Sequence, residues 1–170
     1  MILVEADVSD DWDSSTDWRV QVERAVRAAV AASRHSALLD AGLAVEVSVK
    51  LTHDAEVEAL NAGYRGKDKA TNVLSFPMFE ADLLPSLAGV DGGELLLGDV
   101  VLAQGVCARE AEAKSVPLAD HAAHLVVHGT LHLLGYDHVE GEAEAVAMEQ
   151  VEREALAALG IADPYEVHPG

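Results

Sequence analysis

The chain has 170 residues, half of them hydrophobic, so it can fold as one domain (1–170) around a core and is excluded from the disordered class. Lys and Arg total 11 against 30 Asp and Glu, which gives a formal net charge of −19 at pH 7. This charge argues against broad nucleic-acid or membrane binding, because a polyanion is repelled, so any such binding must depend on local basic groups.

The hydrophobic periodicity of the first third predicts a strand, a helix and a second strand. ILVEADVS alternates as a strand does, and 17–39 has the period of a helix whose inward positions are Val22, Val26, Ala29 and Val30. Gly42 follows this helix and suits a left-handed cap. Residues 43–52 form the clearest predicted strand, because they alternate over Val45, Val47, Val49 and Leu51.

The rest of the chain mixes two further strands with helices. A short helix is predicted at 54–62 and a strand at 72–79, where Pro77 favours a sheet edge or a strand end. The Pro and Gly residues of 81–93 indicate a loop, and GELLLGDVVLA after it indicates a strand. Three helices are predicted at about 103–114, 117–134 and 141–159, with Pro117 suited to a first helical turn. This order favours an α+β fold in which helices pack on a small mixed β-sheet.

The single cysteine, Cys107, excludes a disulfide within the chain and favours a reducing compartment. Its place in a predicted helix favours a small buried side chain over a nucleophile. The N-terminus lacks a basic segment followed by an apolar run, and no stretch of about 18 apolar residues occurs, so we expect neither a signal peptide nor a membrane span. These observations predict a cytoplasmic protein.

Residues 128–138, HGTLHLLGYDH, hold three of the eight histidines. Each helical residue advances about 100°, so His128 and His132 lie about 40° apart on one face. Gly135 can end the helix with a positive φ and let the chain turn, which brings His138 toward the same point. Three converging imidazoles leave a fourth position for water, as in catalytic zinc sites. We therefore expect a zincin-like metal-binding helix and one Zn²⁺ per chain.

Two other features keep alternatives open at this helix. His121 and His124 fall on the same face, so His124 and His128 form a possible ligand pair, although only His132 precedes a turn that can deliver a third ligand. Core, supporting or helix-surface positions are therefore expected for His121 and His124. The spacing matches that of metzincin proteases, which have a Glu general base directly after the first histidine, but here that position is Gly129. A different hydrolysis is therefore expected.

At these residues the sequence resembles the YbeY family of bacterial endoribonucleases that mature ribosomal RNA. The resemblance is carried by HGTLHLLGYDH, LNAGYRGKDKATNVLSFP, LLGDVVLA and MEQVEREALAALGIADPY. It implies a single-strand-specific, metal-dependent endoribonuclease that acts in small-subunit (16S) rRNA 3′-end maturation and ribosome quality control. The implied partners are the ribosomal small subunit or its associated proteins. It also implies His128, His132 and His138 as zinc ligands, Arg65 as a functional residue and Asp99 as a site or partner-contact position.

The same residue types suit phosphodiester hydrolysis. Zinc held by three neutral histidines lowers the pKa of bound water to about 7 and supplies hydroxide without a Glu base. Arg65 can hold the phosphate through the planar fork of its guanidinium. The nucleophile can be either the metal-bound hydroxide or the RNA 2′-OH, because both are compatible with these residues. We predict Arg65 and His128 as catalytic residues. Arg65, Lys67 and Lys69 form a basic group in an acidic chain and are the predicted substrate-binding residues.

Some assignments stay open at this stage. Asp137, beside His138, and Asp99 are candidates to orient ligands, although a turn-capping role explains Asp137 equally well. A second basic group includes Arg27 and Arg34, which share one face of the predicted helix 17–39. A solvated face is favoured there over an RNA path.

Two rival functions also remain. One is a metal hydrolase of another substrate, such as a peptide, which the missing Glu base disfavours. The other is a non-catalytic ribosome assembly factor with a structural metal. Structural zinc sites are usually closed by four protein ligands, so that site would need a fourth histidine or a carboxylate.

Overall fold

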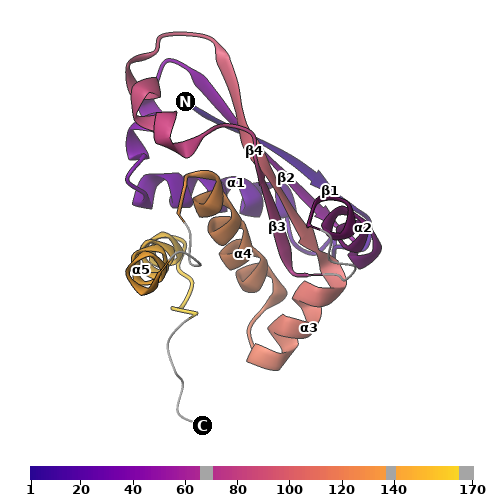
Figure 1. Cartoon of the computed structure of the whole chain (residues 1–170). Helices are drawn as coiled ribbons and strands as arrows, with labels where there is room; N and C mark the ends of the chain where they lie inside the picture. Colours follow the sequence, from indigo (N-terminus) through magenta and orange to yellow (C-terminus); the bar gives the residue numbers. More distant parts are fainter. Residues whose placement is uncertain (66–70, 137–140, 165–170) are drawn as a thin grey trace.

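The computed structural model describes residues 1–65, 71–136 and 141–164, without the side chains of Tyr64, Arg65 and Ala88. Its elements are β1 (Ile2–Val8), α1 (Trp18–Ala32), β2 (Ala44–Thr52), α2 (Asp54–Arg65), β3 (Val73–Pro77), β4 (Glu94–Ala103), α3 (Gln104–Lys114), α4 (Leu118–Leu133) and α5 (Glu142–Ala158). Two 3₁₀ helices, Ser36–Asp40 and Ala81–Gly89, lie between them. The predicted α+β class is confirmed (Figure 1).

The sheet is mixed, with the strand order β1-β2-β4-β3. Strands β1, β2 and β4 are parallel, and β3 pairs antiparallel with β4. Strand β3 therefore lies at an edge, where Pro77 is its last residue and its missing N–H costs no ladder hydrogen bond. The small mixed sheet and the edge position of Pro77 agree with the sequence prediction.

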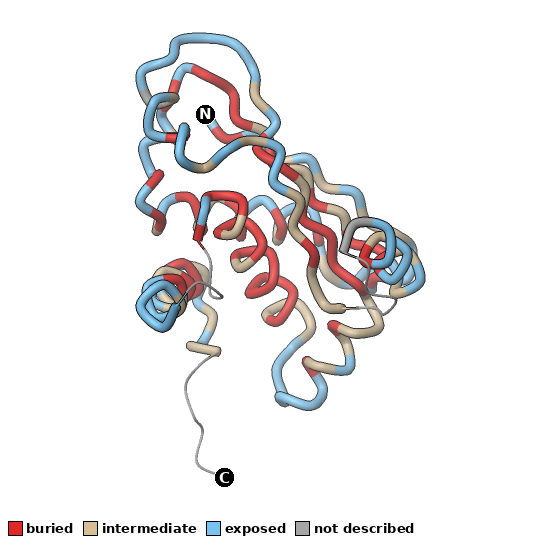
Figure 2. The backbone as a smooth tube through the Cα atoms, viewed as in Figure 1, coloured by how far each residue is buried: buried red, intermediate tan, exposed pale blue. Residues whose placement is uncertain are grey.

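The helices are layered on both sides of the sheet (Figure 1). Helices α1 and α4 pack on one face, α5 packs against α1 and α4 from outside, and α2 contacts β4 on the other side. The alternating residues of β2 are buried against the helical layer, and so are the predicted inward positions of α1, namely Val22, Val26, Ala29 and Val30. Figure 2 shows this buried layer between the sheet and the helices.

Four local predictions are wrong. Helix α1 ends at Ala32 rather than at residue 39, because Ser33 is extended and its N–H and hydroxyl both donate to Val30 O. Gly42 has no positive φ; its missing side chain instead makes room for Asp91, whose Oδ1 would lie 2.6 Å from a Cβ there. The predicted loop 81–93 contains the 3₁₀ helix Ala81–Gly89, which is anchored by the buried Leu84. Pro117, placed in a first turn, caps α4 instead.

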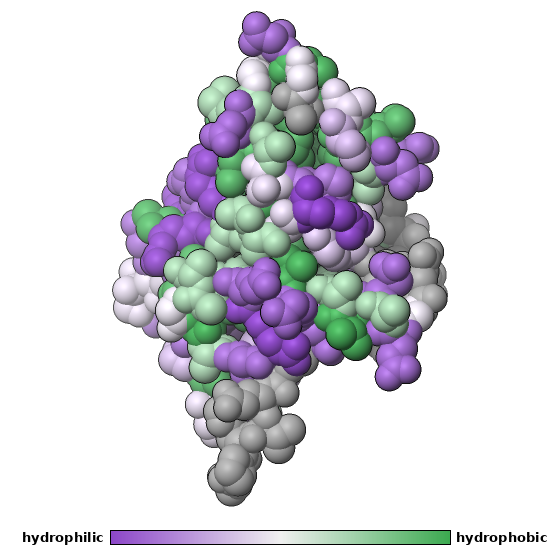
Figure 3. Space-filling model, turned by 90° about the vertical axis from the view of Figure 1, so that its left-hand side faces the viewer, coloured by the Kyte–Doolittle hydropathy of each residue, from purple (hydrophilic) through white to green (hydrophobic). Residues whose placement is uncertain are grey.

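Cys107 is fully buried on α3, as predicted. Burial, with smaller contributions from Glu110 and Asp54, raises the pKa of its thiol to about 12, so a thiolate nucleophile is disfavoured. In the described part of the chain, no helix is both long enough and apolar enough to cross a bilayer. Figure 3 shows the face on the side of α5, where hydrophilic and hydrophobic residues interleave.

Candidate metal centre and active site

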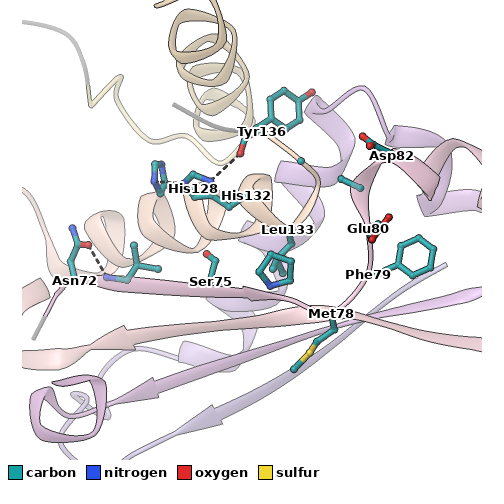
Figure 4. Close-up of a pocket in the computed structure, with 14 residues that line it drawn as sticks. Asn72, Ser75, Met78, Phe79, Glu80, Asp82, His128, His132, Leu133 and Tyr136 are labelled. Atoms are coloured by element: carbon teal, nitrogen blue, oxygen red, sulfur yellow. Dashed lines mark hydrogen bonds between the residues drawn. The ribbon is translucent and has the colours of Figure 1, made fainter. Parts of the chain in front are cut away.

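Helix α4 brings two predicted ligands together. Nε2 of His128 and Nε2 of His132 lie 3.0 Å apart, and their ring centroids are 4.6 Å apart. Figure 4 shows the two side chains close together on α4, beside the residues that line the groove. A tetrahedral zinc with Zn–N bonds of about 2.0–2.1 Å separates two ligand nitrogens by roughly 3.3 Å. The pair therefore needs only a small adjustment to bind one ion.

The other nitrogen of each ring is held by an acceptor. Nδ1 of His132 is 2.9 Å from the carbonyl oxygen of Tyr136, and Nδ1 of His128 is 2.5 Å from Oε1 of Glu152. Because carbonyl and carboxylate oxygens accept hydrogen bonds, these contacts favour the tautomer with the hydrogen on Nδ1 in each neutral ring. Their Nε2 lone pairs then face the same point. Metal-binding histidines are oriented in this way, so the donor set fits a divalent metal such as zinc.

Glu152 on α5 is a site residue that the sequence analysis missed. Its side chain is 0% exposed, and its second oxygen lies 3.2 Å from Nε2 of His124. A buried carboxylate requires such partners, because its desolvation is costly. The signal was present in the sequence: Glu152 lies four residues after Met148 and four before Leu156, on the buried stripe of α5. An acid within an apolar stripe indicates a buried polar contact.

The two earlier histidines of α4 have supporting positions. His121 is buried, with Nε2 at 2.9 Å from Oε1 of Glu110, and burial lowers its pKa. His124 shares the Glu152 carboxylate with His128. The centroids of His124 and His128 are 6.4 Å apart, farther than those of the pair formed by His128 and His132. The geometry therefore favours His132 over His124 as the ligand beside His128.

The predicted glycine stop of α4 is confirmed. Gly135 has φ +97, and its N–H donates to His132 O at 3.0 Å. The N–H of Tyr136 donates to Leu131 O at 3.0 Å, which completes a Schellman motif. His138 and Asp137 lie outside the described residues, so the third ligand stays a prediction. Within the residues that are described, no three His, Cys, Asp or Glu side chains cluster as a metal site.

Packing explains why a glycine follows the first histidine. A Cβ at Gly129 would lie 2.7 Å from Cγ1 of Val100 and 3.1 Å from Oγ of Ser75. Ser75 also donates a hydrogen bond to the carbonyl of Gly129 at 3.2 Å. Helix α4 thus lies so close to β4 and β3 that any side chain at Gly129 would have to displace Val100. The position that holds the general base in metzincins is therefore closed to a glutamate in this fold.

A groove of about 1200 Å³ lies beside the two histidines (Figure 4). Its walls come from β3 and the residues on either side of it, and from the end of α4 and the turn that follows. They include Asn72, Ser75, Phe79, Glu80, Asp82, Leu133 and Tyr136. The side chain of His128 is 21% exposed, so the groove reaches the candidate ligands. A molecule that enters this groove therefore reaches His128 and His132.

The remaining predicted residues lie in different places. Arg65 is the last residue of α2, and Lys67 and Lys69 lie outside the described residues. Asp99 lies on β4 beside Val100, which faces α4, so Asp99 faces the opposite side of the sheet. There it makes the smallest contribution, after Glu5, burial and Glu94, to a raised pKa of Glu46. The structure does not bring Asp99 to the histidines, so an orienting role is unsupported, while partner contact stays a prediction.

Comparisons with known proteins agree on one family. A family model described as Endoribonuclease YbeY matches residues 9–160. Proteins named Endoribonuclease YbeY from Rhizorhabdus wittichii and Sphingopyxis alaskensis are 58% and 55% identical to the chain, and the matches cover 98% and 97% of this chain and 98% of each relative. The solution structure of TM1509 from Thermotoga maritima matches 97% of this chain and 100% of its own, with a TM-score of 0.51 and 20% identity, which supports the fold.

Proposed function

The chain belongs to the Endoribonuclease YbeY family, and on this premise we propose that it is a metal-dependent endoribonuclease specific for single-stranded RNA. Its proposed cellular role is maturation of the 3′ end of the small-subunit rRNA, together with ribosome quality control. The proposed partners are the ribosomal small subunit or its associated proteins, in the cytoplasm. The name of the family, endoribonuclease, supports RNA as the substrate.

One observation carries the catalytic proposal. The Nε2 atoms of His128 and His132 converge at 3.0 Å beside the groove, while both Nδ1 atoms are held by acceptors. We assign these two residues and His138 as the ligands of one Zn²⁺. When bound, zinc supplies Lewis acidity that polarises a phosphoryl oxygen and makes water more acidic. Nitrogen ligands favour zinc among the divalent ions without excluding the others.

The residues of the chain supply orientation and charge. Glu152 and the Tyr136 carbonyl hold the His128 and His132 rings, and the groove admits a strand to them. In our proposal Arg65 binds the scissile phosphate through two parallel N–H groups and stabilises the charge that develops on its oxygens. Lys67 and Lys69 bind neighbouring phosphates. With a net charge of −19, affinity depends on these few close contacts or on delivery by a partner.

The geometry weighs against both rival functions. A peptidase needs a general base beside the metal, and a Cβ at Gly129 already meets Val100 at 2.7 Å. A structural metal is usually enclosed by four protein ligands, whereas a groove of about 1200 Å³ adjoins His128 and His132. An open site is typical of a metal that meets a substrate.

The proposal is tested by incubating the purified protein with single-stranded RNA, with and without a chelator, beside the Arg65→Glu variant. We expect cleavage by the wild type alone, and only without chelator. Equal cleavage in every lane would mean that the activity belongs to another site or to a contaminant. Metal analysis should find about one zinc per chain, and the His128→Ala and His132→Ala variants should lose it.

A further inference from the structure

We propose that Arg34 and the cavity beside it form a second phosphate-binding subsite, which holds an RNA backbone phosphate away from the bond that is cut. The inference rests on the proposed endoribonuclease function and extends the site along the strand. The cavity has a volume of about 520 Å³, and its walls include Arg34, His35, Leu38 and Pro85. It shares Ala81, Asp82 and Gly135 with the histidine groove, so the two cavities adjoin.

Arg34 is held in place by Tyr136, which follows the end of α4. Because α1 ends at Ala32, Arg34 lies outside the helix, and its backbone N–H donates to Tyr136 Oη at 2.9 Å. Its guanidinium carbon lies 4.1 Å from the centroid of the Tyr136 ring, which is a cation–π contact. The carbonyl of the same tyrosine accepts from His132. One residue therefore positions both a candidate metal ligand and a planar cation.

The charge of Arg34 is available for an anion. Arg27, Arg109 and Arg153 are each paired with a carboxylate, but none of the ion pairs between described residues involves Arg34. Its side chain is exposed. A stacked guanidinium keeps its N–H edge free for a planar fork of donors, which matches phosphate oxygens. The chain has a net charge of −19, so this cation beside the groove is opposite in charge to most of the ionisable side chains of the chain.

The residues at the junction of the two cavities determine which chemical groups of the RNA face Asp82 and which face Arg34. A Cβ at Gly135 would lie 2.6 Å from Cβ of Ala81 and 3.6 Å from Nη2 of Arg34, so this turn, the 81–82 segment and the guanidinium lie close together. The carboxylate of Asp82 lines both cavities and repels a phosphate. Ribose hydroxyls or base amino groups can donate to it instead. A strand that crosses the junction thus presents sugar or base to Asp82 and phosphate to Arg34.

The test measures RNA affinity independently of cleavage. A fluorescent single-stranded ten-nucleotide RNA is titrated with full-length protein in a chelator, which stops the proposed reaction without altering Arg34, and the dissociation constant is measured at several salt concentrations. We expect Arg34→Gln to weaken binding about tenfold. It should also reduce the slope of log affinity against log salt by about 0.7, the value for one phosphate contact on a single strand. Arg34→Lys should keep the slope but lose part of the affinity, because the planar fork is missing.

The matched control is Arg24→Gln, which removes the same charge from an exposed position on α1 outside both cavities. It should leave affinity and slope near those of the wild type, and circular dichroism should show all variants folded. An equal loss in Arg24→Gln and Arg34→Gln would overturn the subsite, because the effect would then be general charge. No loss in Arg34→Gln would also overturn it. If the wild type binds RNA through Arg34 but never cuts it, the endoribonuclease proposal fails while the subsite stands.

Discussion

Replacing Glu152 by Gln should weaken zinc binding while leaving the fold intact. The carboxylate is 0% exposed and lies 2.5 Å from His128 Nδ1 and 3.2 Å from His124 Nε2, so water does not replace these contacts. Gln has the same shape, and its oxygen still accepts from His128, but its charge is absent. Loss of a supporting partner typically lowers metal affinity about 10- to 100-fold, or about 1.4–2.7 kcal/mol. We expect about tenfold for Glu152→Gln and about 100-fold for Glu152→Ala.

The assay is competition for zinc against a chromophoric chelator at fixed pH, with circular dichroism to establish folding. The control is Glu154→Gln, the same change at an exposed position of α5, where the carboxylate contacts only Gln150 among the described hydrogen bonds. This control should bind zinc as tightly as the wild type. If the Glu152→Gln and Glu154→Gln variants have equal zinc affinities, the buried carboxylate does not act through His128 and the reasoning is refuted.

Three further predictions concern packing, reactivity and pH. Gly129→Ala should lower the free energy of unfolding in urea by about 1–2 kcal/mol, because overpacking against Val100 outweighs the higher helix propensity of Ala; an unchanged or higher value would contradict the close approach. Cys107 should resist a thiol reagent in the folded protein and react only in denaturant, since its pKa is raised to about 12; rapid labelling of native protein would show an accessible thiolate. Burial lowers the pKa of His121, so the folded state binds a proton at this imidazole more weakly than the unfolded chain does. The stability that is present above pH about 6.5 should therefore be lost as the pH falls through the folded pKa. His121→Asn should flatten that loss in urea titrations between pH 7 and 5, and an unaltered pH dependence would assign it to other groups.

Local periodicity was sufficient to predict most of the fold. The strict alternation in β2 and the apolar stripe of α1 each depend on neighbouring residues, so the sequence shows them directly. The facing pair His128 and His132 was predictable for the same reason, because one helical turn fixes their relation. The end of α1 could not be predicted in this way. It depends on hydrogen bonds from Ser33, whereas the helical pattern of the sequence continues past that residue.

Residues that meet across the fold were harder to predict. Glu152 is 24 residues from His128 in the chain, and only the packing of α5 on α4 brings its carboxylate to the ring. The family resemblance suggested Asp99, but the alternation of β4 turns it away from the histidines. The close approach at Gly129 likewise depends on the distance between a helix and a sheet, which the sequence does not specify.

The contact between Glu152 and His128 also has a consequence for the order of events during translation. Domains begin to fold from the N-terminal end as they are synthesised, and α5 leaves the ribosome after α4. Until it emerges, a nascent chain holds His128 without its carboxylate partner, so the metal site that we propose is not fully supported before α5 has been made. On the proposed function, we expect a nascent chain that still lacks α5 to cut RNA poorly.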